Sequence, residues 1–286
     1  MYLVELDLEK FFDKVNHDKL MSLQMCKVSD KNTVKLIHQY LRSGIMKDGV
    51  VSQRTEWTPQ GNPLSLLLSN IIHDELDKEL SSRGHSFVRY ADYCSIYVRS
   101  EKSAYRVLTS ITTYLEERLK LKVNRDKSMV NRPTDSTLLG FSFYNGKGKW
   151  AIRVAKKSIE CIKAKSNQIT EWNNGSNNKE KLLKMKPVIH GWVNYFSKAN
   201  AKSITDQLDA SVRTRFRIGL WKEWKSCKTK VINLLKLKAS RQKAYEWGNS
   251  SRGYCRVAHS PILCATLNNP YFRSHGYEGF ADTYRG

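Results

Sequence analysis

Residues 87–98 have the sequence FVRYADYCSIYV, in which two apolar-rich runs flank Ala91-Asp92. Such runs predict a hairpin with these two residues near its turn. The apolar run Tyr2–Asp7 predicts a buried strand that ends in a second aspartate. A carboxylate at such a place is costly to bury unless it is paired or binds a metal. If the hairpin packs beside the first strand, Asp7 and Asp92 meet on one rim and can hold one or two Mg²⁺ ions; alternatively, both are ordinary strand-end or turn residues.

The rest of the pattern predicts alternating helices and strands, then helices alone. Before residue 150 we expect a helical turn over 8–15, helices over 32–43, 63–83 and 100–120, a hairpin over 45–57, and short strands over 137–143 and 150–154. After it we expect helices over 155–172, 179–197, 204–225 and 228–245. This order predicts an α+β domain over 1–150, a helical domain over 151–245 and an irregular tail over 246–286.

The charge is unevenly spread. The 286 residues carry a net charge of +22, and residues 151–286 contain 26 Lys and Arg against 9 Asp and Glu. Such an excess indicates a nucleic acid partner, although solvated lysines kept for solubility would give the same count. No apolar run is long enough to span a membrane, so no membrane partner is expected. The six cysteines lack metal-ligand spacing and, without an export signal, indicate free thiols in the cytoplasm.

Five stretches in order over residues 1–145 resemble the motifs of group II intron reverse transcriptases. Leu6–His17 is similar to their first metal motif, and Arg89–Asp92 to the start of the second. Thr58–Ser65 resembles the motif that contacts template and nucleotide. Leu121–Ser128 is similar to the following lysine motif, and Leu138–Phe141 to the primer-grip strand.

This resemblance implies an α+β fold, in which a reverse-transcriptase palm of antiparallel sheet and helices is followed by an all-helical thumb or maturase domain. It implies that Asp7 and Asp92 hold Mg²⁺ for RNA-directed DNA synthesis from a primer, an RNA template and deoxynucleoside triphosphates. It also implies that Lys127 lies near the leaving pyrophosphate, unless it is a plain solvated lysine.

Three more residues gain roles from the resemblance. Phe12 matches the bulky ring that excludes a ribose 2′-hydroxyl, although a core phenylalanine would look the same. Gln60 and Gly61 would lie against the nucleotide and template, where glycine permits close backbone approach.

The resemblance continues into the basic half of the chain. His190–Phe196 and Phe216–Trp224 look like the maturase-specific domain, which implies binding to group II intron RNA and assistance with splicing and mobility. Cations contact phosphates and flat side chains stack on unpaired bases. The candidate nucleic-acid contacts are Trp192, Tyr195, Arg213, Arg215, Arg217, Lys222 and Lys225. Alternatively, the tryptophans of the second stretch, Trp221 and Trp224, face a helical core.

Several departures from the family pattern bear on activity. Tyr93 stands where a second aspartate is expected, and a neutral phenol is a poor Mg²⁺ ligand. Trp57, Asn62 and Leu66 replace two glycines and a proline of the nucleotide motif. The fingers segment does not precede Asp7 and no histidine–cysteine cluster of an endonuclease module follows, so we expect an N-terminally truncated form. Three functions stay open: a polymerase completed by a separate fingers chain, an RNA-binding maturase without polymerase activity, and a non-functional remnant.

Overall fold

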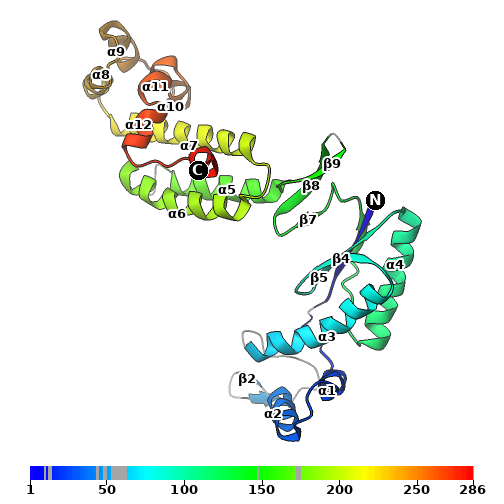
Figure 1. Cartoon of the computed structure of the whole chain (residues 1–286). Helices are drawn as coiled ribbons and strands as arrows, with labels where there is room; N and C mark the ends of the chain where they lie inside the picture. The colour runs from blue at the N-terminus through cyan, green and yellow to red at the C-terminus, as the bar shows by residue number, and fades with distance from the viewer. Residues whose placement is uncertain are drawn as a thin grey trace. The chain divides into compact units, whose positions relative to one another are not determined.

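The structure, a computed structural model, divides into two compact units, Met1–Ser136 and Thr137–Gly286 (Figure 1). The strands after residue 136 therefore belong with the second unit, although the sequence placed the domain boundary at 150. Within the described part of the chain, no helix is long and apolar enough to cross a membrane. The described residues are 1–9, 11, 15–42, 45–47, 50–52, 63–146, 148–171 and 175–285, with the backbone alone for 45–47, 50–52 and Pro63.

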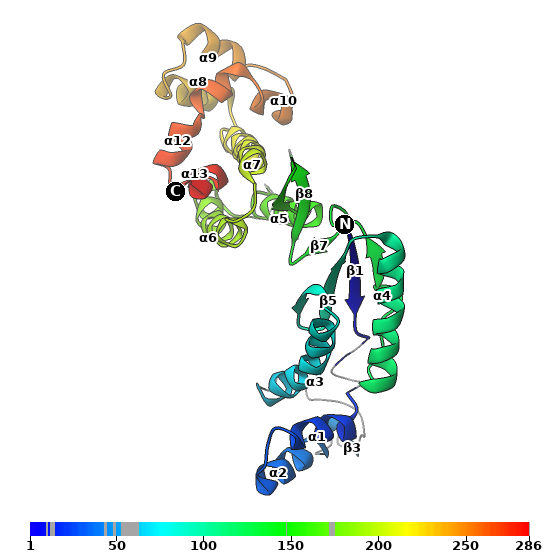
Figure 2. The same cartoon turned by 45° about the vertical axis from the view of Figure 1, so that its right-hand side comes forward.

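The first unit is built on a four-stranded antiparallel sheet in the order β4-β5-β1-β6. Strand β1 runs along the middle of the sheet beside β5, as Figure 2 shows. The predicted first strand and the predicted hairpin are both confirmed. The bounds are β1 Tyr2–Asp7, β4 Ser86–Tyr90, β5 Tyr93–Val98 and β6 Met129–Asn131.

The helices of the first unit follow the predicted apolar spacing. Ser100 caps the N-terminus of α4 by accepting a hydrogen bond from the Ser103 amide. Gly84, with φ of +69°, follows the last turn of α3, one residue after the end of the predicted helix over 63–83. The elements are α1 His17–Met25, α2 Lys31–Arg42, β2 Ile45–Lys47, β3 Val50–Ser52, α3 Pro63–Ser82, α4 Glu101–Thr113 and a π-helical turn η2, Tyr114–Arg118.

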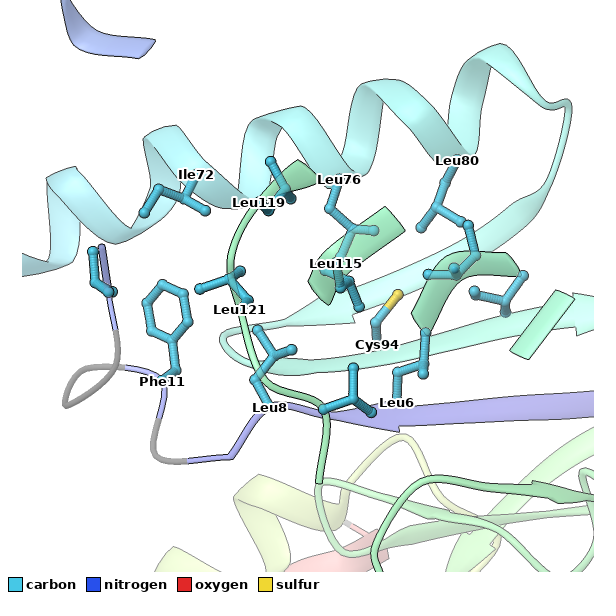
Figure 3. Packing of buried hydrophobic residues seen from close by; sticks show 14 of the residues in the cluster. Leu6, Leu8, Phe11, Ile72, Leu76, Leu80, Cys94, Leu115, Leu119 and Leu121 are labelled. Carbon is cyan, nitrogen blue, oxygen red and sulfur yellow. The ribbon is translucent and has the colours of Figure 1, made fainter. Parts of the chain in front are cut away.

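The core of the first unit lies between the sheet and its helices (Figure 3). Leu6 and Cys94 from the sheet, Leu76 and Leu80 from α3, and Leu115 from η2 are all 2 % exposed or less. Burying a leucine side chain stabilises the folded state by about 1.5–3 kcal/mol. The helices cover one face of the sheet. Side chains alternate between the two faces along a strand, so the neighbours of Leu6 in β1, including Asp7 at its end, point to the other face.

His73 of α3 is a buried titratable group in this core, 3 % exposed and stacked on Phe11 with ring centroids 4.3 Å apart. Burial, with the charge of Arg89 adding to it, lowers the pKa of His73 to about 4. Between pH 6.5 and 4 the unfolded chain binds a proton that the folded chain does not, so stability falls as the pH falls through that window.

We expect this histidine to make the free energy of unfolding fall by roughly 3 kcal/mol between pH 7 and pH 4. Denaturant unfolding at a series of pH values measures the slope. The His73→Asn variant removes the titrating group and should flatten the slope between about pH 6.5 and 5. Equal slopes for the variant and the natural chain would contradict the prediction.

The second unit begins with a three-stranded antiparallel sheet in the order β7-β8-β9 and continues as helices. The predicted helix over 228–245 is wrong in one respect, because Lys238 adopts φ of +61° and separates two helices. The strands are β7 Thr137–Leu138, β8 Phe141–Gly146 and β9 Lys149–Val154. The helices are α5 Lys156–Ile169, α6 Asn178–Phe196, α7 Lys202–Glu223, α8 Cys227–Lys236 and α9 Arg241–Gly248.

The C-terminal segment after residue 246 differs from the irregular tail that the sequence predicted. Phe272 and Phe280 are 2 % exposed or less and pack in the same core as α6 and α7. Burial of these rings therefore makes the C-terminal segment part of the second unit. Its four short helices are α10 Tyr254–Ala258, α11 Pro261–Thr266, α12 Asn269–Ser274 and α13 Phe280–Arg285.

Candidate functional site

The two predicted metal-binding aspartates lie at the same end of the sheet of the first unit. Asp7 is the last residue of β1 and pairs in register with Tyr93, the first residue of β5. Asp92 immediately precedes Tyr93 in the two-residue turn that joins β4 to β5. The carboxylates therefore come from neighbouring strands at one rim, as the sequence predicted. Both side chains are half-buried.

Arg89 of β4 holds this turn in place, a role that the sequence analysis missed. Its guanidinium donates two hydrogen bonds to the Asp77 carboxylate, at 2.8 and 2.6 Å, and one to the carbonyl oxygen of Ala91 at 3.2 Å. Ala91 has φ of +51°, a conformation that a non-glycine residue rarely adopts. A bidentate ion pair to α3 therefore supports the strained turn that presents Asp92.

Lys127 approaches the same rim from the loop after η2. Its ammonium nitrogen lies 3.4 Å from Oδ2 of Asp7, and its side chain is 70 % exposed. The loop is fixed to the end of β1, because the Asn124 amide donates to the Asp7 carbonyl at 2.8 Å. The structure thus brings Lys127 to the rim that carries Asp7 and Asp92. The cation can neutralise Asp7 or meet a bound phosphate.

Tyr93 donates its hydroxyl hydrogen to Oε1 of Glu5 at 2.5 Å. Glu5 is 7 % exposed and also accepts hydrogen bonds from Ser136 Oγ at 2.5 Å and from Asn131 Nδ2 at 2.7 Å. Three hydrogen-bond donors therefore satisfy the buried Glu5 carboxylate. Among the described residues, no ion pair neutralises its charge. An acidic residue inside the apolar run of β1 was the sequence signal for such a network.

The phenol of Tyr93 does not act as a metal ligand in this arrangement. Burial raises its pKa, and the hydrogen bond to Glu5 raises it further, so the group stays protonated at neutral pH. Its oxygen is engaged as a donor toward β1. The position where the family pattern expects a carboxylate therefore contributes a hydrogen bond between strands.

The donor set fits a Mg²⁺ ion held jointly with a substrate phosphate. Mg²⁺ in proteins keeps several waters and binds through one or two carboxylates plus phosphate oxygens, which matches Asp7 and Asp92. In the described part of the chain, no group of three His, Cys, Asp or Glu side chains forms a closed metal site. The two aspartates can therefore share an ion when a triphosphate supplies the remaining ligands.

The predicted nucleotide contacts Phe12, Gln60 and Gly61 lie outside the described residues, as do Trp57 and Asn62. Leu66, which replaces the proline of the motif, lies in the first turns of α3 and is 61 % exposed.

Three of the predicted nucleic-acid contacts on α7 make contacts within the second unit. Arg217 is 9 % exposed and donates to the Leu267 carbonyl at 3.0 Å. Arg215 donates to Thr170 Oγ1 at 2.6 Å, and Arg213 lies 3.9 Å from the buried carboxylate of Asp209. The guanidinium groups of Arg215 and Arg217 therefore hold α7 to its neighbours, whereas the pair of Arg213 with Asp209 lies within α7.

The other predicted contacts are more varied in exposure. Lys225 is exposed, and the Lys222 ammonium lies 5.3 Å from the ring centre of Tyr254. Trp192 packs between Phe196 and Phe280. Trp221 is 1 % exposed, which confirms the core alternative for that ring. The remaining contact, Tyr195, is 54 % exposed and donates to the Leu139 carbonyl at 2.9 Å.

Sequence models of two families match the chain. Residues 1–143 match the family described as reverse transcriptase (RNA-dependent DNA polymerase). The chain belongs to the reverse transcriptase family. Residues 159–237 match the group II intron, maturase-specific domain, which joins this reverse transcriptase to the group II intron members. The order of the two domains agrees with the order of the motifs, and the α+β fold of the first unit agrees with a reverse-transcriptase palm.

Two curated relatives of this chain support the same grouping. Protein YkfC of Escherichia coli is 27 % identical over 176 residues, which cover 50 % of this chain and 45 % of YkfC. The group II intron-encoded protein LtrA of Lactococcus lactis subsp. cremoris is 36 % identical over 77 residues, 27 % of this chain and 13 % of LtrA. The matches thus span less than half the length of either relative.

Among solved structures, a telomerase from Candida albicans in complex with a fragment of telomeric RNA aligns with a TM-score of 0.45 and 12 % identity. The alignment covers 96 % of this chain and 48 % of the telomerase.

Proposed function

We propose that this chain is a reverse transcriptase/maturase-like protein that binds group II intron RNA and assists its splicing and mobility. The observation that carries the proposal is the charge of the second unit, where residues 137–286 contain 28 Lys and Arg against 9 Asp and Glu. A polyanion that contacts exposed cations releases counterions, so this excess favours RNA. Exposed Lys225 is the predicted contact with the greatest freedom to reach a phosphate.

Binding to group II intron RNA is expected to weaken steeply with salt. The logarithm of the affinity should fall linearly with the logarithm of salt concentration, by about 0.7–0.9 per contacted phosphate. Filter binding over a salt series measures the slope. Lys225→Ala should reduce the slope by about 1. Lys186→Ala is the matched control, because Lys186 is already paired with Glu278 at 2.6 Å. A salt-independent affinity would contradict the proposal.

DNA synthesis on an RNA template is the second candidate function, supported by Asp7, Asp92 and Lys127 at one rim of the palm sheet. Asp7 and Asp92 would hold Mg²⁺, and the bound ion would supply positive charge for transfer of an incoming deoxynucleotide to a primer 3′-hydroxyl. Arg89 keeps the Asp92 turn in position, and Lys127 offers a positive charge beside it.

Primer extension with Mg²⁺, an RNA template and a DNA primer tests this second candidate. Any extension by the natural chain should be lost in Asp7→Asn, because one of two carboxylates then no longer binds the ion. Asp18→Asn, the same change at an exposed residue of α1, controls for a general loss of negative charge. Salt-dependent RNA binding without extension by any variant would identify an RNA-binding maturase without polymerase activity. A chain that fails to unfold cooperatively would instead indicate a non-functional remnant.

A further inference from the structure

A pocket of about 610 Å³ opens in the second unit where three helices meet. The N-terminus of α6, the C-terminus of α7 and the short α12 form its walls; Figure 1 labels these helices. The lining is mostly apolar and aromatic, with Leu220 from α7 and Tyr271 and Phe272 from α12. Pockets of this size and composition take small planar ligands, which a few polar groups orient.

One polar group in this lining has an unused donor. Asn178 is 8 % exposed, and its side-chain Nδ2 has no hydrogen-bond acceptor among the described residues. The amide lies against Gly219 of α7, where an added Cβ would stand 2.6 Å from Asn178 Oδ1. A buried amide without an acceptor costs about 1–3 kcal/mol.

A carboxylate stands beside this donor. Glu223 lines the pocket, and its Oε1 accepts a long hydrogen bond, 3.3 Å, from the backbone amide of Asn178. The exposed Glu223 side chain also lies at the N-terminus of α6, where negative charge is favourable. Lys179 stands in the same lining and carries the positive charge that a phosphate needs. An acceptor and a cation therefore stand beside an aromatic wall.

We propose that this pocket binds an unpaired guanine of the bound RNA. Guanine presents two neighbouring N–H groups on its Watson–Crick edge, at N1 and at the 2-amino group, which match the two oxygens of the Glu223 carboxylate. Tyr271 and Phe272 supply the aromatic surface for the base, and Lys179 meets its phosphate. Adenine and uracil each lack this pair of neighbouring N–H groups. This inference rests on the RNA-binding function proposed above and adds a base preference to it.

Two binding measurements on the full chain test the guanine pocket. The first compares guanosine 5′-monophosphate with adenosine 5′-monophosphate by calorimetry, which does not require RNA binding. The second compares a short oligouridine carrying one central guanine with the same oligonucleotide carrying adenine. We expect about a tenfold preference for guanine in each, as one bidentate base contact gives. Photo-crosslinking from 6-thioguanosine at the central position should attach to Tyr271–His275.

Variants separate the pocket from general RNA binding. Glu223→Gln replaces an acceptor pair with a mixed donor and acceptor and should reduce the guanine preference to less than about twofold. Glu246→Gln, the same change at an exposed residue of α9 outside the pocket lining, should keep the preference. Equal affinity for both bases, or a preference that survives Glu223→Gln, overturns the pocket and leaves salt-dependent RNA binding standing. Preference for guanosine monophosphate without RNA binding overturns the proposed function instead.

Discussion

Replacing Tyr93 with aspartate is expected to destabilise the first unit by about 2–4 kcal/mol in the absence of divalent ions. The change removes the hydroxyl that donates to Glu5 and places a second carboxylate beside one that is 7 % exposed. Asp7 pairs in register with position 93, so three carboxylates would then gather on one face of β1 and β5. Denaturant unfolding at pH 7 and low ionic strength measures the loss.

Tyr93→Phe is the matched control for this experiment. It removes the same hydroxyl without adding charge, so it should cost about 1–2 kcal/mol. The difference between the two variants reports the repulsion between carboxylates, and Mg²⁺ should reduce that difference by binding the folded state of Tyr93→Asp. If Tyr93→Asp is as stable as the natural chain without Mg²⁺, the network around Glu5 does not hold these strands together.

The same substitution also bears on Mg²⁺ binding at the rim that carries Asp7. Because Tyr93 is integrated into the network of Glu5, Asn131 and Ser136, aspartate at this position does more than return a metal ligand. The Tyr93→Asp variant is expected to bind Mg²⁺ more tightly than the natural chain, since it adds a carboxylate to the rim that carries Asp7. A second change in the same chain, Glu5→Gln, would relieve the added repulsion.

Much of the palm follows from local patterns in the sequence. Apolar runs and turn residues predicted β1, the β4–β5 hairpin and α3, and the register between β1 and β5 places Asp7 beside the Asp92 turn in the structure. The role of Glu5 could not be predicted in the same way, because its partners lie 88 to 131 residues away in the chain. Hydrogen bonds between such distant positions depend on the packing of whole strands.

In the second unit, by contrast, local sequence signals do indicate short helices after residue 246, where an irregular tail was predicted. Ser260 before Pro261 and Asn268 before an Asn-Pro pair are N-terminal capping patterns, and both residues cap helices in the structure. Once α11 is formed, the Leu267 carbonyl at its end becomes the acceptor for Arg217. Because the tail was predicted to be irregular, the sequence indicated no acceptor there for Arg217. Arg217 was therefore predicted to contact nucleic acid.

Replacing Asp209 of α7 with alanine is expected to destabilise the second unit by about 3–5 kcal/mol. Asp209 is 2 % exposed. Its Oδ1 accepts from the Tyr277 hydroxyl and the Phe280 amide, both at 2.8 Å, and its Oδ2 accepts from the Ala281 amide at 2.9 Å. Alanine leaves three buried donors without an acceptor and releases the first turn of α13. Thermal unfolding measures the loss, and hydrogen exchange at Phe280 and Ala281 should rise with it.

Two further variants make this prediction specific. Asp206→Ala, about one turn earlier on α7, removes a carboxylate that is 51 % exposed and paired with Arg285, so it should cost less than about 1 kcal/mol. Gly279→Ala would place a Cβ 2.7 Å from Asp209 Oδ2 and should destabilise α13 by about 1–3 kcal/mol without removing any hydrogen-bonding group. If Asp209→Ala and Asp206→Ala cost the same, the C-terminal segment is held by its apolar contacts alone. A larger cost for Asp209→Ala, matched by faster exchange in α13, shows that one buried carboxylate anchors the end of the chain to the helix that carries Arg213, Arg215 and Arg217.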